Sequence, residues 1–339
     1  MIAPVSRVRT CIIGAGTSAR QHIVGWQAVE DSQVVAVVDL DESRARGLAL
    51  EFGIENTSTD YQAAIARPDI NIISLCSATA LHGPIALDAV GNHKHIFCER
   101  NTTHVLGEYD ELLATARRKR VAVGMSFPRR FSPSFVRIRE MMDEELLGRP
   151  VMYRVHCLMP APGSNSASSE ARNIKVFLDL FADHYDLWAW LFRSDVVRVT
   201  ARGFSWAKRE SAQRKRLDTA PDTGVVLIEY GTGDMGVITA ACAMQPEFKP
   251  FLTHEEELFG PQGVITDIQP TQFTHRDHLG RAQEHKFEPQ HAYTEAIQEF
   301  ASRIRRGEPP RVSGDDGRRA LRVGLAITDS MESGEAIAF

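Results

Sequence analysis

The residues whose types and spacing most clearly indicate chemistry lie near the start of the chain, in the segment VRTCIIGAGTSARQH. Gly14, Gly16 and Ala19 form a G-x-G-x-x-A pattern between an expected strand and an expected helix. In a dinucleotide-binding βαβ unit, the first glycine allows a tight turn and the second lets the backbone approach a pyrophosphate. The third small residue lets helix and strand pack closely. The amides at the helix start, around Thr17 and Ser18, then face the phosphates. The segment therefore predicts a dinucleotide-binding site.

Asp39 follows the second expected strand, in VVAVVDLDESRA, and predicts which dinucleotide is bound. A carboxylate here can accept hydrogen bonds from the adenosine ribose hydroxyls and would repel a 2′-phosphate, so we expect NAD, with NADP less favoured. Two arginines, Arg44 and Arg46, could weaken that discrimination. The alternative is that Asp39 caps the next helix, a role that Asp41 can fill at least as well.

Short β-branched runs alternate with helical stretches in the first third of the chain, and this rhythm predicts the elements that hold the site. The expected strands are 8–13, 34–38, 72–75, 95–98 and 121–123, and the expected helices are 19–30, 42–52, 60–66, 82–91 and 107–119. Continuous apolar strands joined by helices imply a parallel sheet covered on both faces, whose ligands bind at the carboxyl ends of the strands. We therefore predict a doubly wound α/β Rossmann domain over residues 1–126.

The pattern changes after residue 126, which predicts a second, α+β domain over residues 127–339. Helices are expected at 134–145, 175–192 and 315–333, and strands at 151–158, 196–204, 223–230, 234–243 and 254–259. Turn signals such as GTGD and GPQG separate these strands, so we expect an antiparallel sheet. Residues 160–173 are rich in Pro, Ser, Ala and Asn without periodicity, which predicts a mobile loop.

Composition and charge exclude several classes of protein. The 339 residues are 43% hydrophobic and 24% charged, ordinary values for a globular chain with room for two cores. The net charge of −5 gives no basic surplus for a nucleic-acid partner. No apolar run is long enough for a membrane span, and the N-terminus lacks a signal-peptide pattern. Five scattered cysteines without a CxxC pair suit a reducing cytoplasm, where we expect the protein to reside.

Several sequence blocks, taken in order, resemble the Gfo/Idh/MocA family, the group of glucose–fructose oxidoreductase and inositol dehydrogenase. The blocks span nearly the whole chain and are GAGTSARQH, VVAVVDLD, ALHGPIALDAVGNHKHIFCE, VGMSFPRRFSP, LGRP, LDLFADHYDLWAWL and SGDDGRRALRVGLAITDS. The resemblance implies a Rossmann domain, then an open-faced, mainly antiparallel sheet, with the active site between them. It also implies a homodimer or homotetramer formed through that sheet. The implied chemistry is reversible hydride transfer between a nicotinamide and a sugar, cyclitol or related secondary alcohol.

The chain departs from the family in the motif after the fifth strand, where Glu-Lys-Pro is replaced by Glu99-Arg100-Asn101. The family lysine acts in proton transfer, whereas Arg100 stays protonated and can only polarise a carbonyl or clamp a carboxylate. Asparagine in place of proline makes a cis peptide costly, by roughly 3 kcal/mol. We therefore expect the backbone to run differently there and to re-aim Cys98 and Glu99. The resemblance also places His82 on the nicotinamide side, so His82 and Glu99 are expected cofactor-binding residues.

A second departure lies in the apolar helix where the family pattern is Asp-x-Gly-x-His-x-x-Asp. Asp179 and Asp186 match the flanking aspartates, but the histidine position holds Asp183, and His184 is displaced by about 100° round a helix. Asp179, Asp183 and Asp186 are spaced i, i+4, i+7 and would share one helical stripe. The stripe is either a solvated acidic face or, as its apolar flanks and the resemblance favour, part of the active site with an arginine such as Arg100 as counter-charge. Three helical aspartates form no recognised ligand set, so we predict no metal.

These observations predict an NAD(P)-dependent oxidoreductase with an altered proton-transfer set. Asp183 or His184 would act as acid/base, with Asp179 beside them and Arg100 orienting the substrate or stabilising an oxyanion. The small-molecule substrate would be a polar secondary alcohol, amine or carbonyl compound, and Arg100 favours an anionic one. Two alternatives remain open. One is an NAD-assisted enzyme without net redox, catalysing elimination, epimerisation or glycoside cleavage. The other is a catalytically silent nucleotide-binding sensor or scaffold.

Overall fold

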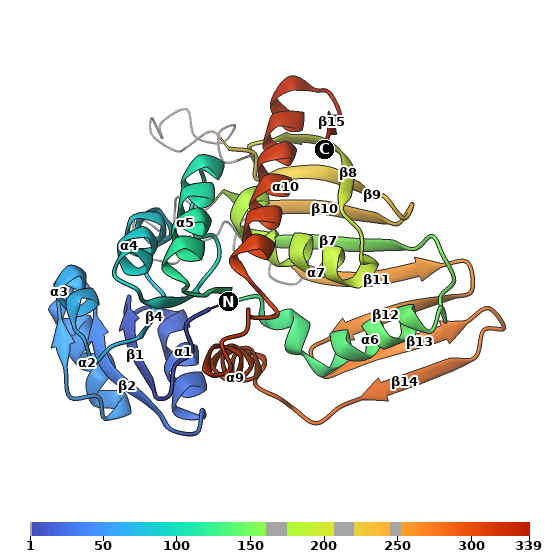
Figure 1. The fold of residues 1–339 in the computed structure, drawn as a ribbon. Coiled ribbons are helices and arrows are strands. Elements are labelled where there is room, and N and C mark those ends of the chain that lie inside the picture. Colours follow the sequence, from blue (N-terminus) through green and yellow to red (C-terminus); the bar gives the residue numbers. More distant parts are fainter. Residues whose placement is uncertain (1, 161–174, 207–219, 245–251) are drawn as a thin grey trace. The chain divides into compact units, whose positions relative to one another are not determined.

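The computed structural model describes residues 2–160, 175–206, 220–244 and 252–339. The chain divides into two compact units, each described by itself below (Figure 1). The first unit comprises residues 1–131 and 291–319, and the second comprises residues 132–290 and 320–339. Within the described part of the chain, no helix is both long enough and apolar enough to cross a membrane.

The first unit is built on a six-stranded parallel sheet with the strand order β3-β2-β1-β4-β5-β6. Its strands are β1 (Val8–Ile13), β2 (Ser32–Val38), β3 (Thr57–Ser58), β4 (Ile72–Leu75), β5 (His95–Cys98) and β6 (Val123–Met125). β1, β4, β5 and β6 are buried along almost their whole length, because helices cover both faces of the sheet. This strand order is that of a Rossmann fold, so the predicted α/β domain is confirmed.

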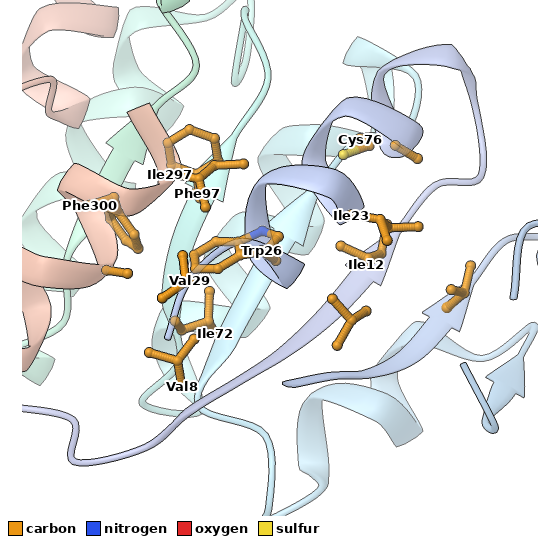
Figure 2. Packing of buried hydrophobic residues seen from close by; sticks show 14 of the residues in the cluster. Val8, Ile12, Ile23, Trp26, Val29, Ile72, Cys76, Phe97, Ile297 and Phe300 are labelled. Atoms are coloured by element: carbon orange, nitrogen blue, oxygen red, sulfur yellow. The ribbon is translucent and has the colours of Figure 1, made fainter. Parts of the chain in front are cut away.

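The core of the first unit is a cluster of apolar side chains between the sheet and its helices. The helices are α1 (Thr17–Gln27), α2 (Glu42–Phe52), α3 (Tyr61–Ala66), α4 (Thr79–Gly91), α5 (Leu106–Lys119), η1 (Pro128–Phe131) and α9 (Ala292–Arg305). Figure 2 shows Trp26 of α1 beside Phe97 of β5 and Phe300 of α9, and both phenyl rings are edge-on to the indole. Ile297, Phe300 and Ile304 form the buried stripe of α9. The helix therefore completes the core of the unit that begins the chain.

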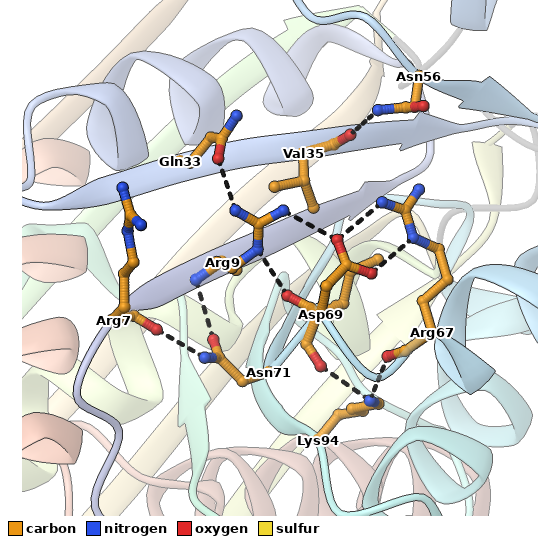
Figure 3. A network of polar contacts seen from close by, with 10 residues as sticks. Arg7, Arg9, Gln33, Val35, Asn56, Arg67, Asp69, Asn71 and Lys94 are labelled. Atoms are coloured by element: carbon orange, nitrogen blue, oxygen red, sulfur yellow. Dashed lines mark hydrogen bonds and ion pairs between the residues drawn. The ribbon is translucent and has the colours of Figure 1, made fainter.

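A network of charged side chains holds the N-terminal ends of three strands of this sheet (Figure 3). Asp69, just before β4, accepts from Arg9 Nη2 at 2.9 Å and from Arg67 Nε at 3.0 Å. These two guanidinium groups hold the pKa of the Asp69 carboxyl far below its usual range. Lys94, just before β5, donates to the carbonyls of Arg67 and Ile70, both at 2.8 Å. Ligands of such sheets bind at the opposite edge, so this network serves stability.

The second unit is built on a nine-stranded sheet with the order β14-β13-β12-β11-β7-β10-β9-β8-β15 (Figure 1). Its strands are β7 (Met152–Pro160), β8 (Val196–Phe204), β9 (Thr223–Tyr230), β10 (Met235–Met244), β11 (Thr253–Gly260), β12 (Gly263–Gln269), β13 (Gln272–Asp277), β14 (Ala282–Lys286) and β15 (Ile337–Ala338). Among the described strands of this sheet, only β7 and β10 form a parallel pair, so the sheet is mainly antiparallel, as predicted. Its helices are α6 (Pro133–Asp143), the π-helical turn η2 (Val176–Leu180), α7 (Ala182–Phe192) and, from residue 320 on, α10 (Gly314–Ser333).

The structure differs from the predicted organisation in its domain division and in elements of the second unit. The prediction assigned everything after residue 126 to the second domain, but residues 291–319 belong to the first unit. The helix α9 was not predicted, and periodicity would in any case show only that such a helix buries a stripe, not against which partner. The strands β12 to β14 were not predicted, because β14, for example, is almost wholly polar and exposed. Residues 161–173 of the expected loop lie outside the described residues.

Gly236→Ala is expected to destabilise the second unit, because the added methyl group would stand 2.2 Å from the Trp188 ring. Overpacking of a filled core costs about 1–3 kcal/mol. The control is Gly47→Ala inside α2, where nothing lies within 4 Å of the position of a Cβ and alanine should add about 1 kcal/mol of helix stability. Urea unfolding followed by circular dichroism measures both changes, and equal effects would contradict this packing.

Candidate functional site

The turn between β1 and α1 is shaped by a glycine that no other residue could replace. Gly14 has a φ of +99°, and a Cβ at this position would lie 2.4 Å from the backbone nitrogen of Ser77. The Gly14 amide donates to the carbonyl of Val38 at 2.7 Å, which ties the turn to the end of β2. The backbone of the turn is therefore fixed against both strands that flank β1.

The next part of the turn is open, which is what a pyrophosphate requires. The atom nearest to the position of a Gly16 Cβ is Nη2 of Arg44, 3.8 Å away. Gly16 is the N-cap of α1 and supplies no side-chain acceptor, so the first helical amides, around Thr17 and Ser18, face outward without a side-chain cap. Ala19 is fully buried, so its small size allows the close packing that the sequence pattern predicts. These features fit a bound dinucleotide phosphate.

Asp39 is half-buried at the end of β2 and organises the same turn. Its Oδ2 accepts from the amide of Ala15 at 2.7 Å, and its Oδ1 accepts from the amide of Asp41 at 2.9 Å. A carboxylate has about four acceptor sites, so both oxygens can still accept from ribose hydroxyls. The alternative that Asp39 caps α2 is wrong, because Asp41 is the N-cap and accepts from the amides of Ser43 and Arg44.

Glu99, directly after β5, is a buried carboxylate that other elements hold by hydrogen bonds. Its Oε1 accepts from Ser126 Oγ at 2.9 Å and lies 3.0 Å from His22 Nε2. His22 Nδ1 in turn lies 2.8 Å from Ser74 Oγ, which accepts from Trp26 Nε1 at 2.8 Å. Burial alone would raise the pKa of Glu99, but its surroundings, with His22 the main contributor, lower it to about 2. Glu99 is therefore ionised. Nothing in the sequence indicates this network beyond the position of Glu99 itself.

Arg100 and Asn101 follow Glu99 directly, just beyond the carboxyl end of β5. The peptide between Arg100 and Asn101 is cis, although neither residue is a proline, and the expected change in the course of the backbone relative to the family stays a prediction. Asn101 is buried. Arg100 Nη1 lies 3.7 Å from Glu99 Oε2, and a quarter of its side chain is exposed. The guanidinium is thus positioned by Glu99 and still exposed enough to contact a ligand.

His82, at the start of α4, ties the ends of two strands together. Its Nδ1 lies 2.9 Å from the carbonyl oxygen of Asn101, and its Nε2 lies 2.7 Å from that of Ser77. The ring is 1% exposed, and burial lowers the pKa of His82. A neutral imidazole has a single N–H, so His82 donates to one of these carbonyls at a time. Its contact with a cofactor stays a prediction.

The acidic stripe expected on one continuous helix is interrupted. The π-helical turn η2 ends at Leu180, and α7 begins at Ala182, so the spacing of Asp179 and Asp183 is not that of one α-helix. Asp179 Oδ2 accepts from the amide of Lys175 at 2.9 Å, which holds η2 at its start. Asp183, in the first turn of α7, is half-buried, and Asp186 is 3% exposed. The aspartates therefore have three different environments.

His184 is buried and faces the sheet of the second unit, where it meets residues that the sequence did not predict. Its Nε2 lies 3.4 Å from Glu256 Oε1, and the Nε2 of His254 lies 2.7 Å from the same oxygen. The Tyr153 hydroxyl donates to the other oxygen of Glu256. Hydrogen bonds with Cys157 and Glu256 raise the pKa of His254 to about 9. The one sequence feature that indicates this contact is the spacing of His254 and Glu256, which are two residues apart in an expected strand and so lie on one face of it.

Comparisons with known proteins cover both units. The family model GFO_IDH_MocA, described as an oxidoreductase family with an NAD-binding Rossmann fold, matches residues 8–127. The model of the GFO/IDH/MocA C-terminal domain matches residues 135–266.

Individual proteins resemble the chain over almost its whole length. Myo-inositol 2-dehydrogenase of Thermotoga maritima is 26% identical over 337 residues, which cover 97% of this chain and 98% of the relative. A levoglucosan dehydrogenase solved with NADH and levoglucosan has a TM-score of 0.86 at 18% identity and covers 98% of this chain and 99% of its own. An oxidoreductase of Agrobacterium radiobacter solved with NAD+, L-tartaric acid and magnesium has a TM-score of 0.83 at 16% identity, with 98% of each chain covered. The two structures share the fold of this chain.

Gly16→Ala is expected to weaken dinucleotide binding at least tenfold, which is about 1.4 kcal/mol, without changing the free energy of unfolding. The methyl group has room in the free protein, where its nearest neighbour is 3.8 Å away, but would occupy the path of the pyrophosphate. Calorimetric titration with NAD and urea unfolding measure the two quantities. A loss of stability that accounts for the loss of binding would contradict the proposed open cradle.

Glu99→Gln is expected to destabilise the first unit by about 2 kcal/mol, because hydrogen bonds to a buried charge are lost. The pH dependence of this stabilisation follows from the pKa of Glu99, which folding lowers from 4.5 to about 2. The carboxylate contributes its full stability above pH 4.5 and loses it as the pH falls toward 2. The difference in unfolding free energy between wild type and variant should therefore shrink over that interval. A difference independent of pH would show that the charge is not involved.

Proposed function

Since the chain belongs to the GFO/IDH/MocA oxidoreductase family, we propose that it is an NAD-dependent dehydrogenase of a polyol or related polar secondary alcohol. The observation that carries the proposal is the glycine turn, closed at Gly14, open at Gly16 and held by Asp39. A related inositol dehydrogenase of nearly equal length supports a cyclitol-like or sugar-like substrate. The alternatives without net redox or without catalysis have less support, since the named relatives are dehydrogenases.

The cofactor preference rests on Asp39. Both of its oxygens lie at the rim of the turn, and a carboxylate there suits a ribose diol better than a 2′-phosphate. Arg44 lies beside Gly16 and is the residue that would tolerate the additional phosphate of NADP. A bound nicotinamide would supply the hydride acceptor for alcohol oxidation. We therefore propose NAD as the physiological cofactor, with Arg44 limiting the discrimination against NADP.

We assign the acid/base role to Asp183 rather than to His184. His184 is buried and faces Glu256 and the sheet, whereas Asp183 is half-buried at the first turn of α7. A catalytic base must reach the hydroxyl proton of the substrate, and Asp183 is the less buried of the two residues. Arg100 keeps its charge at every working pH, so its role is to orient the substrate or to stabilise a developing oxyanion. Asp179 supports the start of η2 and does not transfer a proton.

The charge of Arg100 extends the substrate class to hydroxy acids. A guanidinium binds a carboxylate in a planar, bidentate manner, and a structural neighbour of this chain was solved with L-tartaric acid. The five cysteines are all free and buried, which supports a cytoplasmic location. Val197 and Val225 are exposed on the nine-stranded sheet, which we propose as the surface of a homodimer or homotetramer.

Asp183→Asn is expected to lower kcat by 10²–10⁴-fold with inositols, sugars or tartrate as substrate, because the amide cannot accept the proton. The matched control is Asp267→Asn on an exposed strand residue, which should leave kcat unchanged. Formation of NADH measured by absorbance gives both rates. Consumption of substrate without accumulation of NADH would instead support an NAD-assisted reaction without net redox, and unchanged activity in the Asp183 variant would refute its role.

A further inference from the structure

Two imidazoles and a carboxylate converge on the helix-covered face of the nine-stranded sheet. The Nε2 atoms of His184 and His254 lie 3.4 and 2.7 Å from the same oxygen of Glu256. One ligand atom from each of the three residues lies within 4.8 Å of the other two. We propose that His184, His254 and Glu256 bind a divalent transition-metal ion of the zinc class, which the dehydrogenase function does not require.

The fold places these three side chains together by regular geometry. His254 and Glu256 are two residues apart on β11, so both point to the same face of the sheet. In the antiparallel pairing of β11 with β7, His254 lies opposite Cys157 and Glu256 lies opposite Val155. His184 comes from α7, which packs on this face, as the contact of Trp188 with Gly236 shows. A metal ion here would join a helix to the sheet.

The surroundings of the three residues would hold them for an ion. The Tyr153 hydroxyl binds one oxygen of Glu256 and leaves the other directed at both imidazoles. The rings of Phe181 and Trp188 pack against His184 and set its orientation. Groups that orient ligands in this way are typical of metal sites, because they reduce the cost of ordering the ligands when the ion binds.

Two of the three ligands are buried and the third is half-exposed, which lets an ion enter from solvent. The side chains of His184 and Glu256 are 6% and 5% exposed, whereas that of His254 is 48% exposed. An ion can therefore reach the cluster past His254, while the two other ligands stay fixed. With three protein ligands a tetrahedral ion would keep one position for water.

The types of ligand select the class of metal. Calcium and magnesium take oxygen ligands, whereas two imidazoles with one carboxylate suit zinc and its neighbours, such as cobalt. Ligand atoms about 2.1 Å from a tetrahedral zinc ion lie roughly 3.4 Å apart. The 3.4 Å between His184 Nε2 and Glu256 Oε1 matches this separation, whereas His254 Nε2, 2.7 Å from the same oxygen, would have to move away from it when the ion binds. The expectation of no metal from the sequence considered the helical aspartates alone.

The test is a calorimetric titration of the full-length protein with zinc chloride after treatment with a chelator. Wild type should bind one zinc ion per chain, and His254→Asn and Glu256→Gln should each weaken binding at least 100-fold. His254 is half-exposed, so its substitution leaves the fold least disturbed. The matched control is His156→Asn on β7. The His156 ring is hydrogen-bonded to Thr239 and is not part of the cluster, so this variant should bind zinc as wild type does.

Cobalt gives a second readout that does not depend on activity. Its absorption spectrum in wild type should be that of a four-coordinate ion and should be lost in His254→Asn. No stoichiometric binding in wild type, or equal zinc affinity in wild type and His254→Asn, would overturn the proposal and leave the cluster as a hydrogen-bonded group. Neither result bears on NADH formation, so failure of the metal site is distinguishable from failure of the proposed dehydrogenase.

Discussion

The first unit depends on the burial of one ionised carboxylate, Glu99, at the carboxyl end of its sheet. Burying this carboxylate without hydrogen bonds would cost too much free energy, so the fold needs its hydrogen-bond partners as well as Glu99 itself. They come from α1, through His22, and from the segment after β6, through Ser126. Ser74 of β4 extends the network to Trp26 in the core. One buried charge thereby sets the positions of four elements around the cofactor turn.

The two units meet the same electrostatic constraint in different ways. In the first unit the buried carboxylate is held by donors from helix and strands and lies beside Arg100. In the second unit the buried carboxylate, Glu256, has two imidazoles and a phenol as partners. An imidazole can exchange its proton for a metal ion, and a guanidinium cannot. The first arrangement therefore suits a permanent charge, and the second suits exchange of a proton for a metal ion.

Much of the fold was predictable from local sequence, and the reason is physical. β1, β4 and β5 match the expected ranges residue for residue, because buried parallel strands are continuous apolar runs bounded by polar turns. The glycine turn and the capping role of Asp41 were likewise local. The partners of His184 could not be predicted, because they depend on which strand pairs with β7 and which face α7 covers. The interruption at Phe181 also escaped, since the apolar sequence across it reads as one helix.

The network around Asp69 has a consequence for how this protein could diversify. Two arginines and a lysine fasten the N-terminal ends of β1, β4 and β5, far along those strands from the glycine turn. Strand register is thus secured without help from the loops at the other edge. Those loops can accept insertions and substitutions that alter ligand preference while the sheet keeps its alignment. Mutations at the carboxyl edge of the sheet can therefore change specificity without unfolding the domain, because the contacts that hold the strands lie at the N-terminal edge.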